Sequence, residues 1–452
     1  MISSFKKNLR PLLSAVLLWT AIAMPLAAQH YPFKMVKDDP THTRIYTLNN
    51  GLKVYMSVNK DQPRLQTYIA VNTGSRNDPA ETTGLAHYLE HLMFKGTNHF
   101  GSSNPTAERP LLDSIEHRFE VYRTIKDAQQ RKKAYHEIDS ISQLAARYNI
   151  PNEYDKMMAA IGSEGSNAYT SDDVTCYIEN IPNNELDNWA KVQSDRFQNM
   201  VIRGFHTELE AVYEEYNKHL VRDNDKSWAA LNRLLYPTHP YGTQTTIGTQ
   251  EHLKNPSITN IKNYFSRYYV PNNVAICLSG DIDCDQTIAL IDRYFGQWQK
   301  STTLSRPEFS PQPNLTSPKD STVWGEEAEY ILMGWKMAAA AQPQIDTLKV
   351  VADLLSNGKA GLFDLHLNQP AKVMNSGAFV EAMTDYSTFV LEAYPKEGQS
   401  LDEVKQLLLG EISRMKRGEF SNDLVASVVA NLKLQFQKAL HENRNRTELM
   451  KN

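Results

Sequence analysis

The sequence predicts an α+β fold made of two α/β domains, each a sheet covered by helices. Strand-like and helix-like segments follow one another along the chain, and a stretch rich in proline and serine, residues 301–318, interrupts them. The order of segments after this stretch echoes the order before it. A repeated order on both sides of a linker indicates two domains of similar architecture. We expect the first domain at 30–298, the linker at 299–318 and the second domain at 319–452.

The N-terminus has the pattern of a secretory signal peptide, expected at residues 1–28. Lys6, Lys7 and Arg10 form its basic region, an apolar run follows, and small residues ending at Ala28 offer a cleavage site. The apolar run is too short to span a membrane comfortably. We therefore expect an exported protein, periplasmic or secreted, without a membrane span.

Composition excludes several other classes. A formal net charge of −4 argues against a nucleic-acid-binding surface. The three cysteines contain no C-x-x-C pair, which argues against a disulfide framework. With 41% hydrophobic residues, the chain can build two hydrophobic cores.

The first domain is expected to open with a hairpin at Asn49-Asn-Gly51, a strong turn signal. A strand at 65–71 follows, then a turn-rich loop and a helix starting near Gly84. The domain is expected to end with a strand inside 268–282 and a helix at 284–298. The strand, loop and helix order places a candidate site at the start of that first helix.

That helix contains the most informative motif of the chain, His87-x-x-Glu90-His91. Two histidines four residues apart lie on one face of a helix, so that both imidazoles can bind one metal ion. The order H-x-x-E-H is the inverzincin signature of zinc peptidases. Two imidazoles and one carboxylate hold Zn²⁺ and leave a position for water, whose pKa falls to roughly 7. Glu90 is the candidate general base for that water.

The competing interpretation is an ordinary amphipathic helix with two surface histidines. Leu85, Leu89 and Leu92 form an apolar stripe beside the motif, which anchors a half-buried helix. This context favours the metal site.

A third ligand is expected on the glutamate-rich helix at 205–217. Glu208 and Glu215 lie seven residues apart on one face, whereas Glu210 and Glu214 share a different face. Periodicity alone does not decide which pair faces the metal.

Between these two helices, residues of about 106–155 predict an inserted helical hairpin. Two apolar stripes of helical spacing are separated by a polar run at 126–133. The insertion is expected to be either an extra packing element or a lid beside the substrate.

The second domain is expected to contain strands and helices in an order similar to the first. The expected segments are strand 328–337, helix 345–355, strands 377–383 and 388–394, and helices 401–416 and 421–440. It carries no copy of the metal motif.

These motifs resemble the pitrilysin/insulinase (M16) family of zinc peptidases. The resemblance implies one Zn²⁺ bound by His87, His91 and Glu215, with Glu90 as the base and Glu208 as a supporting carboxylate behind the ligands. It also implies two homologous α/β sandwich domains, of which only the first carries zinc.

Asn167-Ala168-Tyr169-Thr170 resembles the family's strand that pairs with an extended substrate. The implied activity is hydrolysis of peptides or unfolded polypeptides. The alternatives are a catalytically silent member acting as a partner or scaffold, and a zinc-binding protein without hydrolysis. All motif residues are present, which counts against the silent alternative.

By analogy with the first domain, a further helix and a closing strand are expected after residue 452. The second domain also has no Arg followed by Gly-Leu-x-Tyr, which in the family comes from the opposite half of the chamber. We therefore expect that a C-terminal half or a partner chain completes the peptidase.

Overall fold

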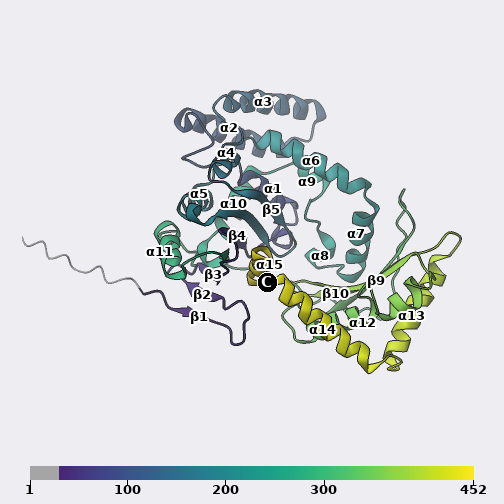
Figure 1. Ribbon diagram of the computed structural model, residues 1–452. Helices are drawn as coiled ribbons and strands as arrows, with labels where there is room; N and C mark the ends of the chain where they lie inside the picture. The colour runs from purple at the N-terminus through teal and green to yellow at the C-terminus, as the bar shows by residue number, and fades with distance from the viewer. Residues whose placement is uncertain (1–29, 452) are drawn as a thin grey trace, which may run out of the picture.

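A computed structural model describes residues 30–451, so the predicted signal peptide at 1–28 lies outside the described residues. Figure 1 shows two sheets, each with helices packed against it, and a pair of helices at the top. The predicted mixture of sheets and covering helices is confirmed.

The first sheet has seven strands in the order β1-β2-β3-β7-β4-β6-β5. All neighbouring strands run antiparallel except β3 and β7, which are parallel. The strands are β1 Phe33–Lys34, β2 Arg44–Thr47, β3 Lys53–Val58, β4 Arg64–Val71, β5 Glu164–Thr170, β6 Thr175–Pro182 and β7 Val274–Gly280. The predicted hairpin at Asn49-Asn-Gly51 joins β2 to β3. Strand β5 forms one edge of the sheet.

Helices and sheet together enclose the largest hydrophobic core, which includes Leu89, Trp189 and Phe295. Its helices follow the apolar periodicity of the sequence. The helices of this part are α1 Leu85–Leu92, α2 Pro105–Thr124, α3 Ala128–Ala146, α4 Glu153–Ala160, α5 Leu186–Asn199, α6 Phe205–Val221, α7 Asp223–Leu235, α8 Pro240–Thr243, α9 Gln250–Leu253, α10 Ile258–Tyr268 and α11 Cys284–Phe295, with short 3₁₀ turns at Ser75–Asn77, Asn183–Glu185 and Pro271–Asn273.

The predicted helical hairpin is confirmed as α2 and α3. Asp127 caps α3, because its carboxylate accepts a hydrogen bond from the Gln130 backbone N–H at 2.8 Å. Phe119 of α2 meets Phe205 of α6 edge to face at 4.9 Å between ring centroids. The insertion therefore packs against the start of α6, and its predicted role as a lid stays a prediction.

The second sheet has three antiparallel strands in the order β8-β10-β9. Chain order and direction repeat those of β4, β6 and β5 in the first sheet, as the echoed sequence pattern predicts. Residues 296–330, between α11 and β8, contain no helix or strand. The elements are β8 Ile331–Met337, α12 Gln344–Leu355, a π-helical turn Asp364–Asn368, β9 Asn375–Ala382, β10 Ser387–Tyr394, α13 Leu401–Lys416, α14 Asn422–Ala439 and α15 Asn443–Lys451.

The last helix, α15, returns to the first sheet and contacts β7, β4 and β3 (Figure 1). The helix carries several charged residues, yet Asn443 and Thr447 are buried. The reason is that this face of the sheet carries polar groups. Asn59 Nδ2 donates to Asn443 Oδ1 at 2.8 Å, and the Arg446 guanidinium donates to Ser57 Oγ at 2.8 Å.

No helix within residues 30–451 combines the length and the apolar character that a membrane span requires.

Candidate metal centre

Helix α1 is held at its N-terminus by a buried aspartate from the preceding loop. Asp78 accepts hydrogen bonds from the backbone N–H groups of Gly84, Leu85 and Ala86, at 2.8, 3.1 and 2.9 Å. Gly84 adopts φ 83°, a left-handed conformation that glycine allows at low cost. Three donors that would otherwise be unsatisfied at the helix start are thereby paired. This fixes the axis of the helix that carries the motif.

The two motif histidines converge on one glutamate of α6. Glu215 Oε2 lies 3.5 Å from His87 Nε2 and 3.7 Å from His91 Nε2. One possible ligand atom from each of these three side chains lies within 4.8 Å of the other two. Within residues 30–451, no other group of three His, Cys, Asp or Glu residues meets this criterion. By contrast, Glu210 points toward His206, at 3.6 Å, and is 68% exposed. The structure thus brings Glu215 rather than Glu210 to the histidines.

Glu90 lies on the same helix and contacts the edge strand. The Thr170 hydroxyl donates a hydrogen bond to Glu90 Oε2 at 2.6 Å. Glu90 is buried. Burial raises the pKa of its carboxyl group, and the hydrogen bond from Thr170 acts in the opposite direction.

Glu208, two turns before Glu215 on α6, supports His91 from behind. His91 Nδ1 lies 3.3 Å from Glu208 Oε2, and the Lys95 ammonium contacts the other carboxylate oxygen. A carboxylate on the far nitrogen of a metal-binding imidazole fixes the ring's orientation and tautomer. Burial alone would raise the pKa of Glu208, but the hydrogen bonds with His91 and Lys95 lower it, so the group is a carboxylate.

The pKa values of the two histidines shift in opposite directions. Burial, with the nearby His91 and His219, lowers the pKa of His87 to about 4, so its imidazole is neutral at pH 7. Burial also disfavours charge on His91, but the hydrogen bond to Glu208 and the charges of Glu215 and Glu90 outweigh it and raise the pKa. A metal ligand must be a neutral imidazole, which His87 already is.

The donor set suits a zinc ion. Two imidazoles and one carboxylate are borderline and hard ligands of the kind found in catalytic zinc sites. Three carboxylates, Glu90, Glu208 and Glu215, interact with these histidines, and Lys95 pairs with Glu208. A divalent cation would offset the remaining negative charge. His87 Nδ1 is buried and has no hydrogen-bond partner in the described part of the chain.

The residues predicted to bind substrate, Asn167 to Thr170, form the second half of the edge strand β5, and their substrate role stays a prediction. Strand β5 pairs on one side with β6, and no strand of the described residues pairs with its other side. Asn167 is exposed, while Ala168, Tyr169 and Thr170 are partly buried. Strand β5 also contacts α1. Strand β5 therefore lies beside the helix of the candidate metal centre.

Sequence reasoning did not find Asp78 or Lys95, nor the contact between Thr170 and Glu90. An aspartate shortly before a helix is a recognisable capping signal. Asp78 stands six residues before Gly84, however, outside the usual capping position. The contacts of Lys95 and Thr170 join segments far apart in the chain, for which the sequence holds no local signal.

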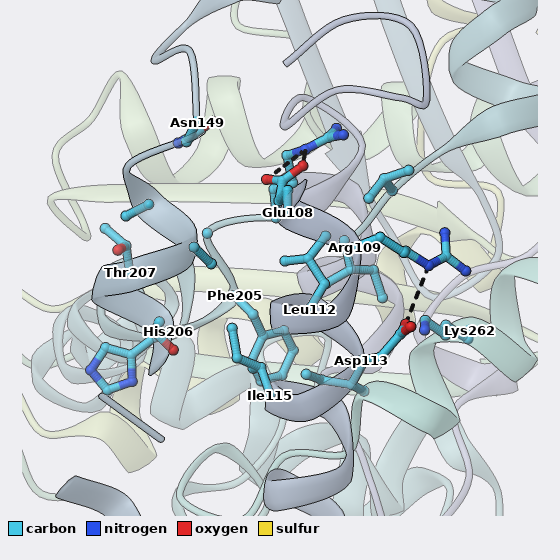
Figure 2. A pocket seen from close by; sticks show the side chains of 18 of the residues that line it. Glu108, Arg109, Leu112, Asp113, Ile115, Asn149, Phe205, His206, Thr207 and Lys262 are labelled. Atoms are coloured by element: carbon cyan, nitrogen blue, oxygen red, sulfur yellow. Dashed lines mark hydrogen bonds and ion pairs between the residues drawn. The ribbon is translucent and has the colours of Figure 1, made fainter. Parts of the chain in front are cut away.

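A separate cavity of about 450 Å³ lies between the insertion and the start of α6. Figure 2 shows Leu112 and Ile115 of α2 and Phe205 of α6 at its wall, with Arg109 and Asp113 joined by an ion pair at 3.2 Å. Glu108 and Arg203 form a fully buried ion pair beside it. Neither motif histidine lines this cavity, so the centre on α1 is distinct from it.

Comparison with known families gives two matches along the chain. Residues 53–109, which include the H-x-x-E-H motif, match the model described as "Insulinase (Peptidase family M16)". Residues 257–432 match the model described as "Peptidase M16 inactive domain". Both models describe one class of protein, the M16 peptidases. The chain belongs to this family, as the resemblance in its motifs implies.

Two curated relatives carry zinc-protease names. The "Uncharacterized zinc protease YmxG" of Bacillus subtilis is 24% identical over 69% of this chain and 63% of its own length. The "Zinc protease PqqE" of Helicobacter pylori is 23% identical over 94% of this chain and 84% of its own. The chain therefore spans less than two thirds of the Bacillus protein that it matches.

Solved structures support the fold. "The crystal structure of a protease from Helicobacter pylori" matches with a TM-score of 0.74 at 20% identity, covering 90% of this chain and 88% of that one. The periplasmic protease PqqL from Escherichia coli matches with a TM-score of 0.63 at 16% identity, covering 92% of this chain but 42% of that one. This fold thus occurs both as most of one chain and as about half of a longer one.

Proposed function

We propose that this protein is a zinc-dependent metalloendopeptidase that hydrolyses peptides or unfolded polypeptides after export through its N-terminal signal. The observation that carries the proposal is the convergence of His87, His91 and Glu215, with Glu90 on the same helix. Membership of the M16 family supports it, because the named relatives are zinc proteases.

In this proposal His87, His91 and Glu215 hold the zinc ion, and Glu208 orients His91. When bound, zinc supplies Lewis acidity, which polarises a carbonyl group and lowers the pKa of water. Glu90 accepts a proton from the attacking water and passes it to the nitrogen of the leaving amine. The water oxygen bonds to the carbonyl carbon first, and the C–N bond of the peptide then breaks as the amine nitrogen receives the proton from Glu90. The Thr170 hydroxyl holds the Glu90 carboxylate in place for both transfers.

The backbone of residues Asn167 to Thr170 would bind the backbone of the substrate. An extended peptide added to the edge of β5 gains main-chain hydrogen bonds with little dependence on its sequence. Since β5 contacts α1, such a peptide would pass the candidate metal centre. The proposed substrate class is therefore extended or unfolded polypeptide.

We further propose that a second half, on the same polypeptide or on a partner chain, completes the catalytic chamber. The support is that similar folds fill only part of longer proteases such as PqqL. The alternative, a catalytically silent member acting as a partner or scaffold, predicts that any cleavage by an assembly containing this chain does not depend on Glu90.

The test combines metal analysis with a peptide-cleavage assay, with and without candidate partner chains. We expect about one zinc ion per chain and activity that a chelator abolishes. Glu90→Gln should keep the zinc while turnover falls by about 10²-fold or more, because an amide does not accept the proton. Glu210→Gln, which changes a glutamate of α6 that faces away from the histidines, is the matched control. Zinc loss in Glu90→Gln would make Glu90 a ligand, and unchanged turnover would end the proposed mechanism.

A further inference from the structure

Arg76 occupies a buried position where three segments from distant parts of the chain meet. It lies in the loop between β4 and α1, two residues before the capping residue Asp78, and its side chain is only 7% exposed. Its Nε lies 3.0 Å from Asp173 Oδ1, just after β5, and its Nη1 lies 2.5 Å from Asp385 Oδ2, in the turn between β9 and β10. One guanidinium thus bridges both sheets.

The loop of Arg76 is also joined to the end of β5 through its backbone. The N–H groups of Ser75 and Arg76 donate to the carbonyl oxygens of Ser171 and Asp172, at 3.0 and 3.1 Å. The two backbones approach so closely that a Cβ on Gly74 would lie 2.2 Å from the Ser171 oxygen. The loop that caps α1 is therefore packed directly against the turn that follows β5.

The second sheet is attached to the same place. The Thr384 backbone N–H donates to Asp173 Oδ2 at 2.8 Å, and Tyr241 of α8 donates its hydroxyl hydrogen to Asp173 Oδ1 at 2.8 Å. His239 Nε2 lies 3.2 Å from Asp385 Oδ2. The two carboxylates, Asp173 and Asp385, come from different sheets and share Arg76 as their common cation.

We propose that Arg76 is a positioning residue for peptide binding. This inference rests on the proposed peptidase function. By bridging Asp173 and Asp385, it sets the distance between helix α1, which carries the candidate metal ligands, and the peptide-binding edge of β5. It also ties that edge to the second sheet. A buried cation with two anionic partners holds such a geometry because removing it leaves both partly buried carboxylates without their shared cation.

The first test measures hydrogen exchange of the backbone in Arg76→Gln, Asp385→Asn and a control, Arg118→Gln. Arg118 pairs with Glu137 on the surface of the insertion, far from this network. Exchange in residues 164–175 and 375–394 should rise about tenfold or more in Arg76→Gln. Asp385→Asn should raise it mainly in 375–394, and the control in neither. Unchanged exchange in 164–175 of a folded Arg76→Gln protein would overturn the proposal.

If Arg76→Gln fails to fold, Asp173→Asn and Asp385→Asn each remove one side of the bridge. Wild-type exchange in both variants would then overturn the proposal. Zinc content should equal that of the wild type in every variant, since none of the ion pairs of Arg76, Asp173 or Asp385 is to His87 or His91.

The second test is the split between KM and kcat for an extended peptide, in whatever assembly is active. Arg76→Gln should raise KM roughly tenfold with a much smaller change in kcat, because a displaced β5 weakens peptide binding. Arg76→Lys should restore part of the loss. If Arg76→Gln lowered the free energy of unfolding but left KM unchanged, the role of Arg76 would be purely structural. If the wild type cleaves no peptide, the proposed function fails, while the exchange experiment still decides the role of Arg76.

Discussion

Thr170 Oγ1 lies 2.6 Å from Glu90 Oε2, so the last residue of the edge strand β5 is hydrogen-bonded to the glutamate of the metal motif. The two residues are 80 positions apart in the sequence. This bond joins the strand proposed to bind the peptide to the group proposed to move the proton.

Replacing Thr170 with Val should therefore lower peptide turnover about 10- to 100-fold, since a hydrogen bond to a charged group contributes about 1.5–3 kcal/mol. Valine keeps the shape of the side chain and removes only the donor. Zinc content should not change, and Thr170→Ser should restore most of the turnover. Turnover equal to that of the wild type in Thr170→Val would show that the bond has no catalytic role.

Removing the glutamate that faces the histidines should weaken metal binding. We expect Glu215→Gln to lower zinc affinity at least about 100-fold, more than the loss of a residue behind a ligand. Competition with a chelator of known affinity measures this. The controls are Glu210→Gln and Glu214→Gln, and a larger loss in either would assign the ligand to that residue instead.

Removing Lys95 or Glu208, which lie behind His91, should weaken zinc binding less than removing Glu215. Lys95→Met removes the cation that contacts Glu208, and Glu208→Gln removes the carboxylate that contacts His91. Each change should lower zinc affinity about 10- to 100-fold. Because both act through His91, the double variant should lose less than the sum of the two free-energy changes. Strict additivity would indicate independent roles.

Asp78 should matter for stability. Asp78→Ala leaves three N–H groups at the start of α1 without their acceptor. We expect the free energy of unfolding to fall by about 2 kcal/mol or more, measured by denaturant titration. Asp346→Ala, at a residue whose side chain is 84% exposed, is the control and should change little. A loss as small as that of the control would contradict the capping role.

Asp172 predicts a pH-dependent effect. Burial, together with the charge of Asp173, raises the pKa of Asp172 from 3.8 to about 6. Because the pKa of Asp172 is higher in the folded state than in the unfolded state, its protonated form favours folding. This contribution to stability is fully present below about pH 4. That contribution is lost as the pH rises through about 6.

Asp172→Asn should accordingly be more stable than the wild type at pH 8, by at most about 2–3 kcal/mol. The difference should vanish toward pH 4. Asparagine can still accept the hydrogen bond that Ser75 donates to Asp172 Oδ1 at 3.0 Å. Thermal melting of both proteins across pH 4–8 measures the difference, and a constant difference would show that titration of Asp172 is not its cause.

The sequence by itself determined what local periodicity controls. Spacing of four residues puts His87 and His91 on one face of a helix, whatever surrounds them. The alternation of strands, helices and turn residues likewise predicted the hairpin at Asn49-Asn-Gly51, the helical insertion and the repeated order of the second sheet. These features depend on neighbours within a few residues of each other, so the chain encodes them directly.

Only the tertiary structure decided which distant groups meet. Helix α6 offers glutamates on two faces, and the packing of α6 against α1 selects Glu215 and Glu208 over Glu210. The same holds for Thr170 on Glu90, for Arg76 between Asp173 and Asp385, and for the burial of α15. Each contact depends on the angle and distance between elements that are separated by many residues. No local pattern records that geometry, because it arises only when the whole core packs.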